Sequence, residues 1–181
     1  MSVRDAGSDG DLQATGRTYP PILDPSLHQR IALARRVGVL GCGSPFRGDD
    51  AAGTLLAEAL SLSLPAGSRK ARAWSGGAAP ENLTGEVKRF APELLLAVDA
   101  VDMGAEPGDV AIVPMEAIGG VSFSTHKLPL PIVLDYLVEE IGCEVWVLGI
   151  QIGGLGFLGE ITPAVRETVE ALTAELLSLL G

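Results

Sequence analysis

Two neighbouring carboxylates, Asp49 and Asp50, follow a short apolar run and a series of glycines in the first third of the chain. The run Val37–Leu40 predicts a buried strand, and glycines at positions 41, 43 and 48 allow the backbone to turn sharply after it. In an open α/β sheet, ligand sites form at the carboxyl ends of strands. A pair of acids at such a place favours a cation site over a phosphate site.

The same loop is compatible with two other interpretations. Acids at the start of a helix can bind free N–H groups, so one of the two carboxylates is expected to cap a helix. A dinucleotide fingerprint is disfavoured because Phe46 stands where that motif needs a glycine. Gly43 and Gly48 have the outer spacing of a P-loop, but the two acids occupy the places of its Lys and its Ser or Thr.

Three further polar side chains are expected at the same edge of the sheet. Ser75 ends a predicted strand over 71–74 but lies outside a Gly-x-Ser-x-Gly elbow, so a serine nucleophile is not indicated. Asp99 closes the predicted strand Leu94–Val98 and is expected to orient a ligand. His126 lies in a polar loop before a helix, where it is either solvated or a metal ligand beside Asp50; imidazole with carboxylate suits Zn, Ni or Fe.

Strand-like and helix-like segments alternate along the chain. Strands are predicted over 37–40, 71–74, 94–98, 110–113 and 144–150, and helices over 51–64, 80–90, 130–141 and from Thr162-Pro163 onward. This alternation predicts a three-layer α/β/α fold, a twisted and mostly parallel sheet with helices on both faces. Residues 1–27 are polar and are expected to form a mobile tail, so the single domain is predicted to cover 28–181.

Composition excludes several classes of protein. The formal net charge is −10, whereas binding to nucleic acid or to an anionic membrane surface requires a basic face. No apolar run approaches the ~20 residues that span a bilayer, and the polar amino terminus lacks the apolar core of a signal peptide. Cys42 and Cys143 are too few for a disulfide scaffold, so reduced thiols and a cytoplasmic location are expected, with Cys42 as a small buried residue.

Five stretches, taken together and in order, resemble the hydrogenase maturation proteases, in particular the type that processes the large subunit of hydrogenase 3. They are Leu40–Gly43 with Gly48–Asp50, Gly76–Asn82, Val98–Gly104 with Pro107-Gly108, Thr125–Leu130, and Leu148–Gln151. The resemblance extends from Arg36 to about Ala171. Each stretch alone is a weak signal, but all five in this order are specific.

This resemblance implies a nickel-dependent endopeptidase, of an aspartic or metal-recognising type, with a phosphorylase/hydrolase-like α/β/α fold. It would remove a carboxy-terminal peptide from the precursor of a NiFe-hydrogenase large subunit after nickel insertion, with the nickel supplied by the precursor. The family's catalytic and metal-contacting positions fall on Asp50 and His126. Both side chains are expected to be partly exposed, so Asp50→Asn or His126→Ala should abolish processing with little loss of stability.

The third metal-contacting position of the family falls on Ser75, where the family usually has Asp. A neutral hydroxyl is a poorer ligand for a divalent ion than a carboxylate. Glu81, Asp99 or the substrate are the alternatives for the missing ligand. The departure at Ser75 supports a second hypothesis, a non-catalytic assembly factor that binds a hydrogenase-like precursor. An unrelated small-molecule α/β enzyme is a third hypothesis, which the acid pair in the glycine loop disfavours.

Overall fold

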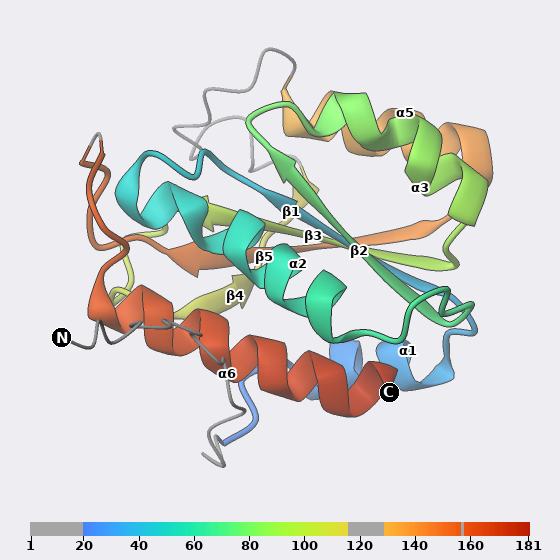
Figure 1. Ribbon diagram of the computed structural model, residues 1–181, viewed down its shortest axis with the longest axis horizontal. Coiled ribbons are helices and arrows are strands. Elements are labelled where there is room, and N and C mark those ends of the chain that lie inside the picture. Colours follow the sequence, from blue (N-terminus) through green and yellow to red (C-terminus); the bar gives the residue numbers. More distant parts are fainter. Residues whose placement is uncertain (1–19, 116–128, 157) are drawn as a thin grey trace, which may run out of the picture.

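A five-stranded sheet with the order β2-β1-β3-β5-β4 forms the centre of the molecule (Figure 1). The computed structural model describes residues 20–115, 129–156 and 158–181. Strands β1 (Val37–Cys42), β2 (Ala71–Gly77), β3 (Leu94–Val101) and β5 (Glu144–Gln151) run parallel, and β4 (Val110–Ile112) pairs antiparallel with β5. The predicted α/β fold with a mostly parallel sheet is confirmed.

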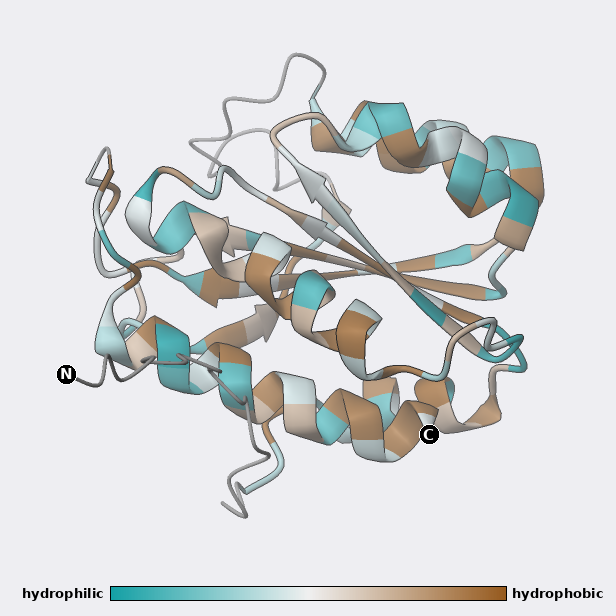
Figure 2. Cartoon of the chain, in the orientation of Figure 1, coloured by the Kyte–Doolittle hydropathy of each residue, from teal (hydrophilic) through white to brown (hydrophobic). Residues whose placement is uncertain are grey.

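The central strands are buried on both faces. Every residue of β1 and β3 is buried, which explains why these segments read as continuous apolar runs instead of alternating patterns. Figure 2 shows this contrast, since the central strands are mostly brown or white while the helices carry both hydrophilic and hydrophobic residues. Burial on both faces requires a helical layer on each side of the sheet.

Helices α1 (Pro25–Leu33), α2 (Ala52–Ser63) and α6 (Pro163–Leu180) cover one face, and α3 (Thr84–Phe90) and α5 (Leu130–Ile141) cover the other (Figure 1). Each face of the sheet has its own hydrophobic core. The core under α1, α2 and α6 includes Leu27, Leu56 and Leu172, and the core under α3 and α5 includes Val87 and Leu134. None of the helices in the described ranges combines the length and apolar character needed to cross a membrane.

Two predicted helices begin with a short 3-10 segment. The first is preceded by η1 (Gly48–Ala51), and the second consists of η2 (Pro80–Leu83) followed by α3. The amino-terminal boundary also differs from the prediction. Helix α1 begins before residue 28, because the Asp24 carboxylate caps it by accepting a hydrogen bond from the Ser26 amide and because Leu23 and Leu27 are buried in the core.

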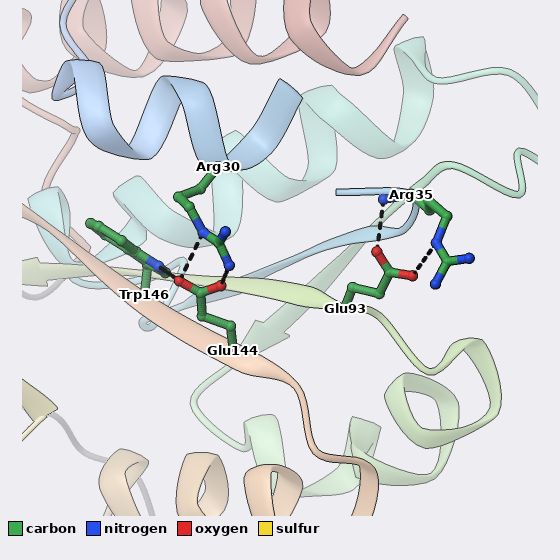
Figure 3. A network of polar contacts seen from close by, with 5 residues as sticks. All are labelled: Arg30, Arg35, Glu93, Glu144 and Trp146. Carbon is green, nitrogen blue, oxygen red and sulfur yellow. Dashed lines mark hydrogen bonds and ion pairs between the residues drawn. The ribbon is translucent and has the colours of Figure 1, made fainter. Parts of the chain in front are cut away.

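Two ion pairs tie the chain together near the amino ends of the strands (Figure 3). The Arg30 guanidinium of α1 binds the Glu144 carboxylate at the start of β5, and the Trp146 indole donates to the same carboxylate. The hydrogen bond from Arg30 lowers the pKa of Glu144. Just before β3, the Glu93 carboxylate accepts hydrogen bonds from the backbone amide and the guanidinium Nε of Arg35. Because these groups are largely exposed, the pairs determine orientation more than stability.

Helix α2 lies directly on the backbone of β1. A β-carbon on Gly41 would lie 1.9 Å from the carbonyl oxygen of Gly53, and one on Gly53 would lie 2.2 Å from the carbonyl oxygen of Val98. Such distances leave no room for any side chain. The two glycines therefore determine how closely the helix approaches the sheet, and with it the position of η1 at the beginning of α2.

Gly41→Ala is expected to lower the free energy of unfolding by about 3 kcal/mol, because the added methyl group must displace the backbone of α2. Urea denaturation followed by circular dichroism measures this change. Gly85→Ala is the matched control, since its β-carbon would meet only the end of the Arg89 side chain, at 3.7 Å. Equal stability of the two variants would contradict the role given to the contact between β1 and α2.

Candidate functional site

The carboxyl ends of the parallel strands bring most of the predicted site residues to one edge of the sheet. Strand β1 is followed by η1, which carries Asp49 and Asp50, and Ser75 lies near the end of the neighbouring strand β2. In the sheet, β1 lies between β2 and β3, so the connection from β1 leads to one side and the connection from β2 crosses back to the other. Such a point, where successive connections diverge, is where open α/β sheets form ligand sites.

The side chain of Asp50 is 5% exposed, and only one of its two carboxylate oxygens accepts a hydrogen bond from the described residues. Its Oδ2 accepts a hydrogen bond of 3.0 Å from the Ser44 amide, and no hydrogen bond from a described residue reaches Oδ1. Gly43 makes this turn possible, because it has a φ of 111° and a β-carbon there would lie 1.8 Å from the Asp50 carbonyl oxygen. The expected partial exposure of Asp50 is therefore wrong, since the turn encloses the side chain.

Asp49 has a different environment from its neighbour, although the two residues are adjacent. Its carboxylate is fully buried and accepts hydrogen bonds from the amides of Gly153, Gly154 and Thr162, at 2.7, 2.9 and 2.6 Å. The Thr162 hydroxyl donates a fourth, at 3.0 Å. The expectation that one of the two acids caps a helix is wrong, because neither η1 nor α2 has a side-chain cap.

The Asp49 carboxylate joins the loop before α2 to the loop between β5 and α6. Two backbone hydrogen bonds reinforce this junction, from the Asp49 amide to the Gly154 carbonyl at 3.1 Å and from the Leu158 amide to the Phe46 carbonyl at 2.7 Å. The orange-red segment before α6 accordingly lies beside the turn that leads into α2 (Figure 1). The two loops therefore form one unit that positions Asp50.

Asp49→Ala is expected to lower the free energy of unfolding by about 2–4 kcal/mol, because it removes the buried acceptor of four hydrogen bonds that join the two loops. Amide hydrogen exchange should also become faster at residues 153, 154 and 162. Asp135→Ala on the exposed face of α5 is the control and should change stability by less than about 0.5 kcal/mol. Unchanged exchange at these three amides would contradict the junction.

Ser75 is exposed near the end of β2, and its hydroxyl donates a hydrogen bond of 3.1 Å to the Glu58 carboxylate of α2. Sequence reasoning did not identify Glu58. Its position on an exposed helical face is the usual place of a solvated acid, and only the packing of α2 against β2 reveals its contact with Ser75. A carboxylate is thus present beside the position where the sequence lacks one.

Asp99 lies inside β3 and not at its end. It pairs with Gly149 of β5, is 1% exposed, and accepts a hydrogen bond from the Ala100 amide. The predicted strand was too short because Ala100 and Val101 continue the buried run beyond the acid. The predicted role of Asp99 in orienting a ligand stays a prediction.

Cys42, at the end of β1, is fully buried, as predicted. Burial raises the pKa of its thiol well above the ordinary value, and the negative charges of Asp99, Asp50 and Glu81 raise it further. These three acids therefore lie in the electrostatic neighbourhood of Cys42. One oxygen of Glu81 is buried without a hydrogen-bond partner among the described residues. A thiolate is disfavoured in these surroundings, which argues against a cysteine nucleophile.

The protein in its native state is expected to resist alkylation by iodoacetamide at pH 8, because burial raises the pKa of both Cys42 and Cys143. Intact-mass spectrometry should show no adduct before unfolding and two in denaturant, since the chain has two cysteines. Cys143→Ala serves to assign any adduct that forms. Modification of Cys42 in the native state would contradict its assignment as an inert core residue.

Gln151 connects the loop after β3 to the end of β5. Its side-chain oxygen accepts from the amides of Met103 and Ala105, and its side-chain nitrogen donates to Asp102 and to the Ile152 carbonyl. All of its hydrogen-bonding groups are thus used within the protein. The stretch Leu148–Gln151 was noted in the sequence without a role, and in the structure its last residue connects the two segments.

His126 lies outside the described residues, so the grouping of Asp50, Ser75 and His126 stays a prediction. Within the described ranges, no three His, Cys, Asp or Glu side chains come close enough together to hold a metal ion. In the described part of the site, Asp50 accepts a hydrogen bond from the Ser44 amide and Ser75 donates one to Glu58.

Comparison with known proteins gives one consistent result. A family model described as "Hydrogenase maturation protease" matches residues 67–179. The hydrogenase 3 maturation protease of Escherichia coli K12 is 39% identical over 143 residues, which cover 76% of this chain and 87% of that protein. A putative hydrogenase maturation protease of Methanocaldococcus jannaschii is 30% identical over 132 residues, which cover 69% of this chain and 77% of that protein.

Solved structures give the same result. The NiFe-hydrogenase maturation protease HycI of Thermococcus kodakarensis superposes with a TM-score of 0.77 at 32% identity, covering 86% of this chain and 98% of that chain. A crystal structure of the hydrogenase 3 maturation protease superposes with a TM-score of 0.68 at 35% identity, covering 81% of this chain and 92% of that chain.

Proposed function

This chain belongs to the hydrogenase maturation protease family, and we propose that it is the endopeptidase that removes a carboxy-terminal peptide from the precursor of a NiFe-hydrogenase large subunit. Nickel is here part of the precursor and thus of the substrate. In this proposal the protease recognises the nickel-loaded precursor and hydrolyses one peptide bond near its carboxy terminus. The cytoplasmic location stays a prediction from the sequence.

The arrangement of Asp50 is the observation that carries this proposal. One of its oxygens is held by the Ser44 amide, while the other accepts no hydrogen bond from a described residue. The carboxylate is therefore oriented before any ligand arrives, and one oxygen remains to contact a metal. Nickel accepts oxygen and imidazole ligands, so Asp50 and His126 together suit a nickel-bearing substrate. Asp99 is proposed to support this site from β3.

The contact between Ser75 and Glu58 concerns the third metal-contacting position that the family resemblance predicts. Ser75 offers a neutral hydroxyl where the resemblance leads one to expect Asp, and that hydroxyl already donates to the Glu58 carboxylate. A site with few permanent ligands permits release of the product together with its nickel. The same feature supports the second candidate function, a non-catalytic assembly factor that binds the precursor without cleaving it. Membership in a protease family favours the endopeptidase.

Incubation of the protein with its nickel-loaded precursor is expected to release one short peptide, which mass spectrometry of the precursor's carboxy terminus detects. Asp50→Asn should abolish release, because a neutral amide oxygen is a weaker ligand for a divalent metal ion than a carboxylate oxygen. His126→Ala should have the same effect. Asp135→Asn is the control and should cleave like the unsubstituted protein, since Asp135 lies exposed on α5.

Ser75→Asp, combined with Glu58→Gln to avoid two adjacent carboxylates, separates the two candidate functions in the same assay. If the endopeptidase proposal holds, the unsubstituted protein cleaves and the double variant cleaves at least as fast. If the unsubstituted protein binds the precursor but leaves it intact, and the double variant cleaves it, Ser75 accounts for an assembly role. Normal cleavage by Asp50→Asn would overturn the assignment of the site.

A further inference from the structure

A backbone hydrogen bond joins two residues with exposed apolar side chains, one of which lies on the turn that carries Asp50. Phe46 is 63% exposed and Leu158 is 73% exposed, and the amide of Leu158 donates a hydrogen bond of 2.7 Å to the carbonyl of Phe46. The other large apolar side chains that are exposed within the described ranges lie on helices or on the short strand β4. Phe46 and Leu158 differ from them in lying on loops that two separate parts of the chain bring together.

These loops are held rigidly although both side chains face solvent. The buried Asp49 carboxylate binds three amides and one hydroxyl of the loop that carries Leu158. The amide of Asp49 returns a hydrogen bond to the Gly154 carbonyl. Because the backbones of these loops are already held in place, binding of a partner requires little further ordering of the backbone, and this favours binding.

Leu158 has a left-handed backbone conformation with a φ of 56°, which is unfavourable for a residue with a branched side chain. No burial of its own side chain compensates for this strain, because most of the side chain is exposed. Strained residues of this kind concentrate at sites of binding and catalysis. The conformation of Leu158 therefore indicates that this position serves an interaction.

The location of the pair indicates what it contacts. Phe46 lies on the same turn as Asp50, four residues before it in the sequence, and the Asp49 junction places Leu158 on the adjoining loop. A protein chain that reaches Asp50 approaches the turn that carries Phe46 and the loop that is joined to this turn. Exposed apolar side chains on loops with a braced backbone provide contact area that does not depend on charge, which suits a protein partner of this acidic chain.

We propose that Phe46 and Leu158 form a contact surface for the hydrogenase large-subunit precursor, where they bind an apolar segment next to the cleavage site. This inference rests on the proposed function, because it takes the precursor as the partner. It adds two residues that neither touch the reacting atoms nor hold metal but determine how tightly the precursor binds.

The test combines Phe46→Ser with Leu158→Asn, because asparagine tolerates the left-handed conformation at position 158. Binding of the nickel-loaded precursor is measured by biolayer interferometry in the Asp50→Asn background, where cleavage does not interfere. The dissociation constant is expected to rise at least tenfold. In the protein with Asp50 intact, KM should rise by a similar factor while kcat stays within about twofold.

The control combines Leu33→Ser with Leu62→Ser, which removes a similar exposed apolar area from helices α1 and α2 near the amino ends of the strands. It should leave the dissociation constant within twofold. Equal binding by the Phe46/Leu158 variant and its parent would overturn the inference. So would a change confined to self-association, measured by sedimentation, because the surface would then contact a second copy of the chain.

Failure of the proposed function gives a different result from failure of this inference. If the unsubstituted protein leaves the precursor intact but loses binding upon substitution of Phe46 and Leu158, the endopeptidase is wrong and the contact surface stands. If the parent protein does not bind the precursor at all, the proposed partner is wrong, and the contact surface is overturned with it.

Discussion

The buried carboxylate of Asp49 is the interaction on which the functional edge of this protein depends. A buried charge is costly unless it is fully hydrogen-bonded, and Asp49 accepts four hydrogen bonds whose donors are all neutral groups of residues 153–162. The turn that carries Asp50 consequently cannot take its position independently of the loop after β5. One side chain thus makes two distant segments into a single rigid element.

The two edges of the sheet are stabilised by different means. Near the amino ends of the strands, exposed ion pairs such as Arg30 with Glu144 tie helix α1 to the sheet (Figure 3). Near the carboxyl ends, buried polar side chains bind backbone amides, with Asp49 on one side and Gln151 on the other. Backbone amides have fixed directions, so this second arrangement holds loops in defined conformations, which recognition of a substrate requires.

Close packing of α2 on β1 connects the core to this edge. Gly41 and Gly53 leave no space for side chains, so the helix axis has only one position relative to the strand. Since η1 leads directly into α2, the helix transmits this position to Asp50. The packing of the apolar core on the α2 face therefore determines where the polar turn with Asp50 lies.

Much of this protein followed from the sequence alone. Apolar runs predicted all five strands of the described sheet, and helical periodicity predicted α5 with the bounds that the structure has. These signals are local, because burial imposes its period on consecutive residues. The glycine loop also predicted an acid pair at the carboxyl edge of the sheet, whereas the choice of Asp50 within that pair came from the family resemblance and stays a prediction.

Only the tertiary structure distinguishes the environments of the two acids. Asp49 and Asp50 are indistinguishable by local pattern, yet one binds donors more than a hundred positions away and the other keeps an oxygen without a hydrogen bond from the described residues. The contact of Ser75 with Glu58 and the junction of Phe46 with Leu158 likewise depend on segments that meet only after folding. Periodicity and local motifs report on neighbours in sequence, whereas these contacts arise from the order of strands in the sheet and the packing of α2 and α6 upon it.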